Sequence, residues 1–169
     1  MTGAELALAR IRKLAAEIRD AQRRLEDLAA EIVSLDPGAG HPSRPVLALI
    51  AVDLHSYYTT VEGLLERIIA GLEGDVPSGA NAHAELLRLA TLPIEGIRPA
   101  IVSPERFDAL DELRKFRHFF RHAYALELRH DKLRRALDPF AALHAGFGTD
   151  LHALLRFLDG LAAELDAGR

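Results

Sequence analysis

A long helical repeat near the N-terminus constrains the fold of this chain more than any other feature. From about Ala4 to Ser34, mostly apolar residues recur at alternating gaps of three and four, which places them along one seam of a helix. The seam consists of Leu8, Ile11, Ala15, Ile18, Gln22, Leu25, Ala29 and Ile32, beside a second row of Leu14, Ala21, Leu28 and Leu35. So broad a face is typical of a bundle helix or of a dimer-forming helix. The seam could serve the core, a dimer or a partner protein.

Breaks rich in proline and glycine divide the rest of the chain into further helices. Ser103-Pro104 and Asp138-Pro139 are good helix starts, because proline is favoured at the first helical position. The interruption Gly146-Phe147-Gly148 could kink the last helix. The predicted helices cover about 4–34, 44–73, a shorter segment that ends near 92, 104–125 and 139–165.

The composition agrees with an all-α fold. Hydrophobic residues make up 49% of the 169 residues and are mostly Leu and Ala, while Val, Thr and Tyr are scarce. We therefore expect a single domain over 1–169, an up-down bundle of four to five helices. The absence of Cys excludes disulfides and thiolate metal sites. Neither a signal peptide nor an apolar run long enough to span a membrane is visible, so we expect a cytoplasmic protein with no membrane partner.

The charge of the chain is unevenly distributed. A formal net charge of −4 argues against a general nucleic-acid binder, and no DNA partner is expected. The segment 111–135 nevertheless holds eight Lys or Arg against four acids, so it carries +4 and the rest of the chain −8. This local excess suits one anionic ligand, although a solvated helix face of mixed charge would have the same composition.

The same segment contains the residues best suited to catalysis or ligand binding. Arg117, His122 and Tyr124 are arranged as Arg-x4-His-x-Tyr on one predicted helix. Arg117 and Tyr124 are almost two turns apart and point the same way, whereas His122 lies roughly 140° around the helix from Arg117. Arg117 and His122 of one helix therefore cannot easily contact the same small group. A cleft between two copies of the helix could, so we expect a homodimer.

Three stretches together resemble a known family. They are Leu113–Tyr124, Tyr57–Ile68, and Pro77-Ser78-Gly79 followed by His83, Leu86 and Leu87. Their pattern is similar to that of HepT-like toxins, ribonucleases of the HEPN (higher eukaryotes and prokaryotes nucleotide-binding) superfamily. The resemblance covers most of the chain after about residue 45. It implies a HEPN-like bundle that acts as the toxin of a toxin–antitoxin pair.

The resemblance also implies roles for particular residues. The activity would be metal-independent endoribonuclease cleavage, with RNA as substrate and no cofactor or metal. Arg117 would bind phosphate and stabilise developing charge, and His122, which titrates near neutral pH, would move protons. Tyr124 would be adenylylated by a cognate minimal nucleotidyltransferase antitoxin, and this modification would silence the toxin. Auxiliary substrate contacts would come from Arg114, His118 and Arg121.

Simpler interpretations exist for each residue. Arg117 could pair with a nearby acid such as Asp111 or Glu112, His122 could be an ordinary core or surface histidine, and Tyr124 a core aromatic. Phe116, Phe119 and Phe120 are expected only to pack. Glu62 and Glu66 are expected to form ion pairs with Arg67 or a neighbour.

Two alternative functions remain open from the sequence. The bundle could be a non-catalytic binding module whose first helix docks a nucleotidyltransferase. His118 and His122, one turn apart, could instead share a metal with His55, as in DinB-like three-histidine bundles. That match is weak, because the second histidine is followed by Ala123-Tyr124-Ala125, without the glycine-containing polar run of those proteins.

Overall fold

The chain folds as a bundle of α-helices in the computed structural model. The structure describes residues 2–36, 38, 40–122 and 130–168, and of His122 only the backbone. No β-strand occurs among these residues, so the predicted all-α fold is confirmed. The elements are α1 (Gly3–Leu35), α2 (Arg44–Glu73), α3 (Ala82–Ala90), the 3₁₀ turn η1 (Pro104–Arg106), α4 (Phe107–His122), α5 (His130–Leu137) and α6 (Phe140–Ala167).

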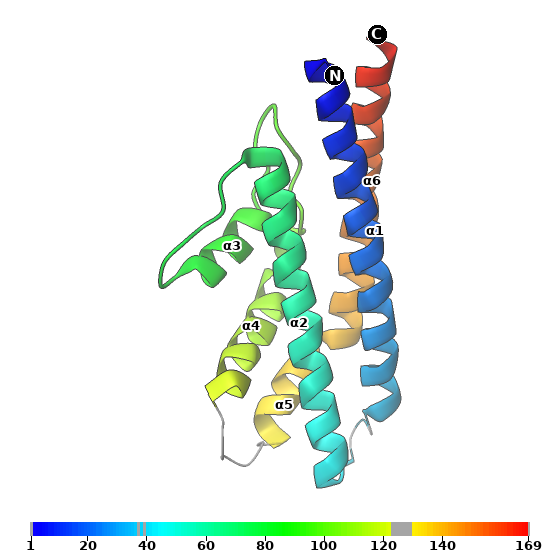
Figure 1. Cartoon of the computed structure of the whole chain (residues 1–169). Coiled ribbons are helices and arrows are strands. Elements are labelled where there is room, and N and C mark those ends of the chain that lie inside the picture. Colours follow the sequence, from blue (N-terminus) through cyan, green and yellow to red (C-terminus); the bar gives the residue numbers. More distant parts are fainter. Residues whose placement is uncertain (1, 37, 39, 123–129, 169) are drawn as a thin grey trace.

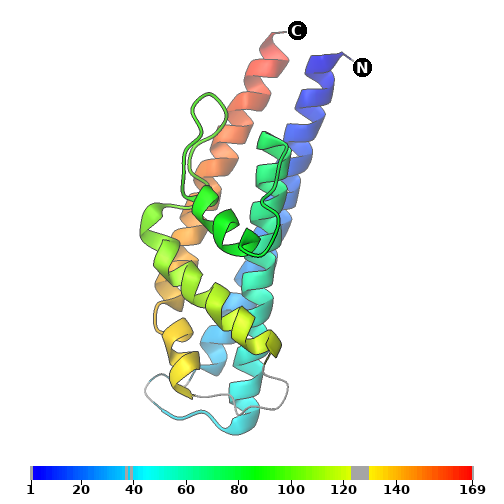
Figure 2. The same ribbon diagram turned by 90° about the vertical axis from the view of Figure 1, so that its left-hand side faces the viewer.

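Three long helices, α1, α2 and α6, form the body of the bundle (Figure 1). Helix α1 packs against both α2 and α6, and the two chain termini lie at the same end. The shorter helices α3, α4 and α5 lie on the other side of α2 from α1. Figure 2 shows that α4 crosses α2 obliquely, and this crossing sets which α4 side chains can meet α2.

The seam of α1 belongs to the core. Its buried members pack against α2 and α6, so within this chain the seam has the first of the three expected roles, that of forming the core. The start of the helix is fixed by a capping box, in which the Thr2 hydroxyl accepts from the Glu5 backbone and the Glu5 carboxylate accepts from the Thr2 backbone. The buried residues of α1 are Leu8, Leu14, Ala15, Ile18, Ala21, Leu25, Ala29 and Ile32.

Some predicted details of the helices were wrong. Ser103-Pro104 does begin the helical segment, as predicted, but its first turn is 3₁₀, and the short helix α5 was not predicted. Helix α6 runs through Gly146 and Gly148 without a break. Gly146 has another role, because a Cβ there would come within 2.6 Å of the Arg106 guanidinium. The predicted extension of the motif helix to about 125 lies outside the described residues.

Two buried charged groups fix the connection that leads into α4. Asp150 on α6 accepts hydrogen bonds from the Ser103 backbone and hydroxyl and pairs with Arg106 at 2.8 Å. The guanidinium of Arg98 pairs with Glu73 at 2.6 Å and donates to the carbonyls of Leu92 and Pro99 in the same connection and to one carbonyl of α3. Because both carboxylates are paired, these charges can be buried and the start of α4 is tied to α2 and α6. Within the described parts of the chain, no helix is both long and apolar enough to cross a membrane.

Candidate functional site

Arg117 lies on α4 with its side chain directed at α2. Its Nη2 is 3.0 Å from Oε2 of Glu62, and its Nε donates to Oγ1 of Thr59 at 3.3 Å. Both charged side chains are largely withdrawn from solvent, with 14% of Arg117 and 6% of Glu62 exposed. The alternative of a pairing with an acid on a neighbouring turn or helix is therefore confirmed, with Glu62 as the partner in place of the two examples, Asp111 and Glu112.

The carboxylate of Glu62 also contacts a histidine from a third helix. Nδ1 of His83, in the first turn of α3, lies 2.7 Å from Oε1 of Glu62. One carboxylate thus contacts Arg117 with one oxygen and His83 with the other. We call Thr59, Glu62, His83 and Arg117 the Glu62 cluster. The His83 side chain is 48% exposed, so the cluster extends from the core to the surface.

The helical register of α2 explains why Glu62 is buried. Glu62 lies on the apolar face of α2 beside Tyr58, Val61 and Leu65, all of which are buried. A carboxylate in such a place needs a charged or hydrogen-bonding partner, since an uncompensated buried charge is costly. Burial, together with the negative charge of Glu62, raises the pKa of Tyr58 well above its usual range. The Tyr58 hydroxyl therefore stays protonated at neutral pH.

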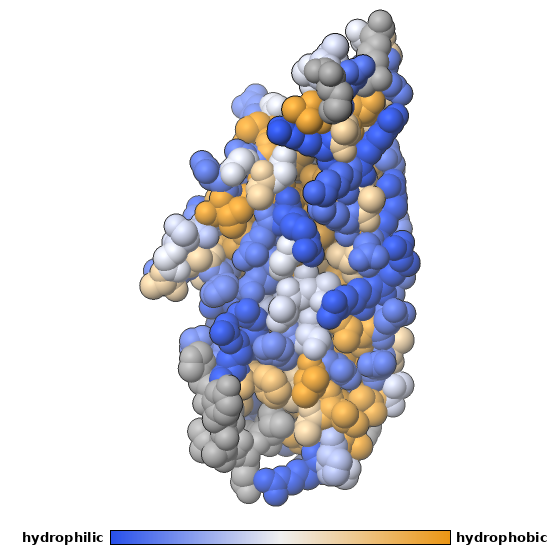
Figure 3. All heavy atoms as spheres, viewed as in Figure 1, coloured by the Kyte–Doolittle hydropathy of each residue, from blue (hydrophilic) through white to orange (hydrophobic). Residues whose placement is uncertain are grey.

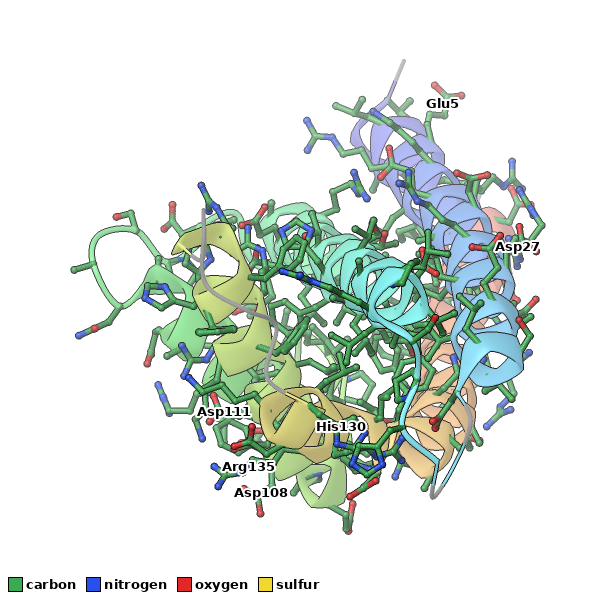
Figure 4. All side chains as sticks on the ribbon, turned by 90° about the horizontal axis from the view of Figure 1, so that it is seen from below. Glu5, Asp27, Asp108, Asp111, His130 and Arg135 are labelled. Carbon is green, nitrogen blue, oxygen red and sulfur yellow. The ribbon has the colours of Figure 1, made fainter. Side chains whose placement is uncertain are left out.

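Arg114 is engaged on the outside of α4. Its Nε is 2.7 Å from Asp111, which also pairs with Lys115 at 2.9 Å. Burial tends to raise the pKa of Asp111, but the hydrogen bonds from Lys115 and Arg114 outweigh it, and the pKa lies below its ordinary value. Figure 4 shows Asp111 at the outer edge of the bundle, away from the carbon-rich interior. The structure does not bring Arg114 into the Glu62 cluster.

Arg121 and His118 are exposed on α4. Arg121 lies one turn beyond Arg117, and both arginines act on the ring of His55 from α2. Burial first, and then the two positive charges, lower the pKa of His55, so its neutral form is favoured. His55 therefore joins the surroundings of Arg117, although the sequence suggested it only as a metal ligand.

Three phenylalanines of α4, Phe116, Phe119 and Phe120, pack as the sequence predicted. Phe116 is buried and stacks with Phe120 at a centroid distance of 6.1 Å, and Phe120 lies 5.2 Å from the His55 ring. The Phe119 ring lies under the ammonium of Lys132, 4.0 Å from its centroid. These rings join α4 to its neighbours.

Part of the predicted site lies outside the described residues. These are the side chain of His122 and the whole of Tyr124. The proposed three-histidine metal site needs His122, so its complete ligand set is not described. Among the described residues, no group of three or more His, Asp or Glu could hold a metal ion. The nearby charges of Arg117 and Arg121 also disfavour a cation beside His55.

A groove of about 770 Å³ runs between α1 and α2, and it reaches the Glu62 cluster at Thr59. Small side chains such as Ala16, Ser56 and Gly63 line it, with charged side chains from both helices at its edges. Figure 3 views the face on which α1 and α2 lie, and blue and pale spheres prevail between them. Its lining residues are Lys13, Ala16, Glu17, Asp20, Ala21, Arg24, His55, Ser56, Thr59, Thr60, Gly63 and Arg67.

Sequence reasoning missed the roles of Glu62 and His83 as members of one cluster. The ion pair of Glu62 with a neighbour was predicted, but its partners were not. One signal could have found Glu62, namely a carboxylate in the apolar register of α2 between Tyr58 and Leu65. No comparable signal marks His83, because α3 is short and its packing against α2 is not encoded in local spacing.

Comparison with known proteins identifies the family. No curated protein and no solved structure matches the chain significantly. A profile described as HepT-like protein matches residues 49–158, well over half of the chain. The matched region contains all members of the Glu62 cluster and the Arg-x4-His-x-Tyr motif. The chain therefore belongs to the HepT-like protein family.

Proposed function

We propose that this protein is the toxin of a toxin–antitoxin pair and a metal-independent endoribonuclease. Membership of the HepT-like family, within the HEPN superfamily of ribonucleases, supports this function. The structural observation that carries it is Arg117, held in place by Glu62 and by Thr59, which also lines the groove between α1 and α2. A guanidinium fixed in this way is suited to a substrate phosphate, because little entropy is lost when it binds.

The proposed reaction uses the ribose 2′-hydroxyl of the RNA as its internal nucleophile. A base removes the 2′ proton while O2′ forms a bond to phosphorus, and the bond from phosphorus to the 5′-oxygen breaks. The 5′-oxygen takes up a proton, which leaves a cyclic phosphate and a 5′-hydroxyl end. Arg117 stabilises the extra negative charge on the phosphate oxygens, and His122 is the acid or base. Because DNA lacks the 2′-hydroxyl, it is not a substrate.

The proposal includes a homodimer. Two copies of α4 would let Arg117 and His122 act on one phosphate, which their angular separation on one helix disfavours. Exposed apolar side chains at one end of the bundle support such an interface, since they would be covered in the dimer. They are Val33 of α1 and Leu49 and Val52 of α2.

The proposed antitoxin is a minimal nucleotidyltransferase that adenylylates Tyr124. The added group carries a phosphate and a bulky adenosine. At a site that contains Arg117, it would occupy the position of the RNA phosphate and repel a second anion. Modified protein is therefore expected to be inactive on RNA.

Cleavage of total RNA by purified protein in excess EDTA tests the proposed activity. Wild type is compared with Arg117→Ala, with His122→Ala, and with Arg135→Ala as a control on an exposed position of α5. We expect cleavage by wild type and by the control, and intact RNA with the other two variants. Intact RNA in every lane, from protein shown by mass to be unmodified at Tyr124, would overturn the ribonuclease assignment.

One observation favours a second candidate function. The charge of Arg117 is already balanced by Glu62, as in an ion pair with a structural role. A non-catalytic module that binds a nucleotidyltransferase would need no more than this. That candidate predicts tight association of the two purified proteins together with intact RNA under all conditions of the cleavage assay.

A further inference from the structure

The Glu62 cluster contains a second imidazole besides the one in the motif. His83 reaches Oε1 of Glu62 with Nδ1, while Arg117 occupies Oε2 of the same carboxylate. The imidazole and the guanidinium are therefore neighbours, although they come from α3 and α4. Because the carboxylate is buried between them, each of the two groups helps to balance its charge.

The second ring nitrogen of His83 is available for a ligand. Nδ1 lies 2.7 Å from Oε1 of Glu62, an ionic contact without hydrogen-bond geometry, so Nε2 is the ring nitrogen that does not face the carboxylate. The side chain is about half exposed, so Nε2 is the nitrogen that substrate can reach. The contact of Nδ1 with the buried carboxylate places the imidazole beside Arg117, which contacts the other oxygen of Glu62.

We propose that His83 is a substrate-contacting imidazole of the Arg117 site, oriented by Glu62, and that it exchanges a proton with the RNA through Nε2. This inference rests on the proposed ribonuclease function and deepens it. Cleavage through the 2′-hydroxyl needs two proton transfers, one from O2′ and one to the 5′-oxygen. The motif supplies one imidazole in each chain, and His83 is the second group. Glu62 is a positioning residue, since it acts through His83 and Arg117.

The charges around His83 agree with an anionic substrate. Glu62 of α2 and Arg117 of α4 cancel each other, so a protonated His83 gives the cluster a net positive charge. A bound phosphodiester would meet Arg117 and His83 together, as a two-sided contact. The exposed Arg121 adds positive charge one turn further along α4.

Two measurements in EDTA test the inference on the full chain. The first is single-turnover RNA cleavage against pH by wild type, His83→Gln, Glu62→Gln and the control His152→Gln, which replaces an exposed histidine on α6. The second is the change in the His83 ring NMR signals when uridine 3′-monophosphate is added to wild type, with the His152 signals as internal control. Circular dichroism establishes that each variant is folded, and His83 is exposed enough for its replacement to be tolerated.

The expected result is a cleavage rate about 100-fold or more below wild type for His83→Gln, with one limb of the pH–rate profile lost. Glu62→Gln should also be slow, the control should match wild type, and the nucleotide should shift the His83 signals and leave the His152 signals in place. If His83→Gln cleaves like wild type with the same pH profile, the inference is overturned and the proposed function stands. If wild type itself leaves RNA intact, the proposed function fails. In that case the NMR measurement tests the contact separately. His83 signals that stay in place at saturating nucleotide would overturn the contact, and shifted His83 signals would support it.

Discussion

The pair formed by Glu62 and Arg117 should dominate the electrostatic contribution of this site to stability. Replacing Glu62 with Leu leaves the Arg117 guanidinium, of which 14% is exposed, without its counter-charge. Breaking a pair buried to this extent costs about 3–5 kcal/mol. For a chain of this length, 1 kcal/mol corresponds to roughly 2–4 °C in Tm. The Glu62→Leu variant is therefore expected to melt roughly 6–12 °C below wild type at the lower cost of 3 kcal/mol.

A double-mutant cycle isolates the pair from the loss of either side chain alone. Arg117→Met should also destabilise, because it leaves a buried carboxylate that retains His83 as its partner. The variant with both substitutions should be at least as stable as Glu62→Leu alone, since both charges leave the interior together. Urea unfolding followed by circular dichroism measures the three free energies of unfolding. The exposed pair of Arg19 and Asp159, 3.3 Å apart, is the control and should show no measurable coupling. If the two single substitutions lower the free energy of unfolding additively, the reasoning is refuted, because each side chain would then contribute independently of the other.

Three further predictions concern neighbouring parts of the bundle. Gly146→Ala should be less stable to urea than Gly148→Ala by about 1–3 kcal/mol, because only the first places a Cβ against Arg106 and displaces it from Asp150; equal stabilities would contradict the close packing. Arg121→Gln should raise the pKa of His55, measured by NMR titration, since it removes one of the positive charges that lower it, whereas Arg135→Gln should leave it unchanged. Asp111 has a lowered pKa in the folded chain, so its contribution to stability is complete above about pH 4 and is lost as the pH falls further. The loss of Tm on acidification should therefore be smaller in Asp111→Asn, and identical slopes would contradict the assignment.

The long helices could be predicted because their signals are local. The spacing of apolar residues in α1 and the proline and glycine breaks around α2 depend on neighbours in the sequence. Helix α5 lacked such a signal, since its eight residues begin without a capping pattern and five of them are charged or His. Its apolar residues Leu133, Ala136 and Leu137 are buried by tertiary packing. Its helical state therefore follows from contacts with the bundle more than from its own propensity.

The candidate site could be predicted only in part for a similar reason. The family resemblance identified Arg117 from a motif within one helix. The groups around Arg117 come from α2 and α3, and their approach depends on how α4 crosses α2 (Figure 2). Residue types and spacing along the chain contain no such information. Glu66, one turn after Glu62, shows this limit, because the two carboxylates look equivalent in sequence and only Glu62 is buried.

The register of α4 explains why Arg117 needed a partner from the core. Leu110 and Leu113 are fully buried, and Arg117 follows them by seven and four residues, so it shares their face of the helix. An arginine on that face meets α2, where a carboxylate is the partner that can balance its charge in the interior. Glu62 provides this balance and brings His83 to the same place. In our proposal, a phosphate that approaches Arg117 would therefore also encounter the imidazole that contacts the same carboxylate. The carboxylate that balances the charge of Arg117 is thus also the group that brings the imidazole of His83 beside it.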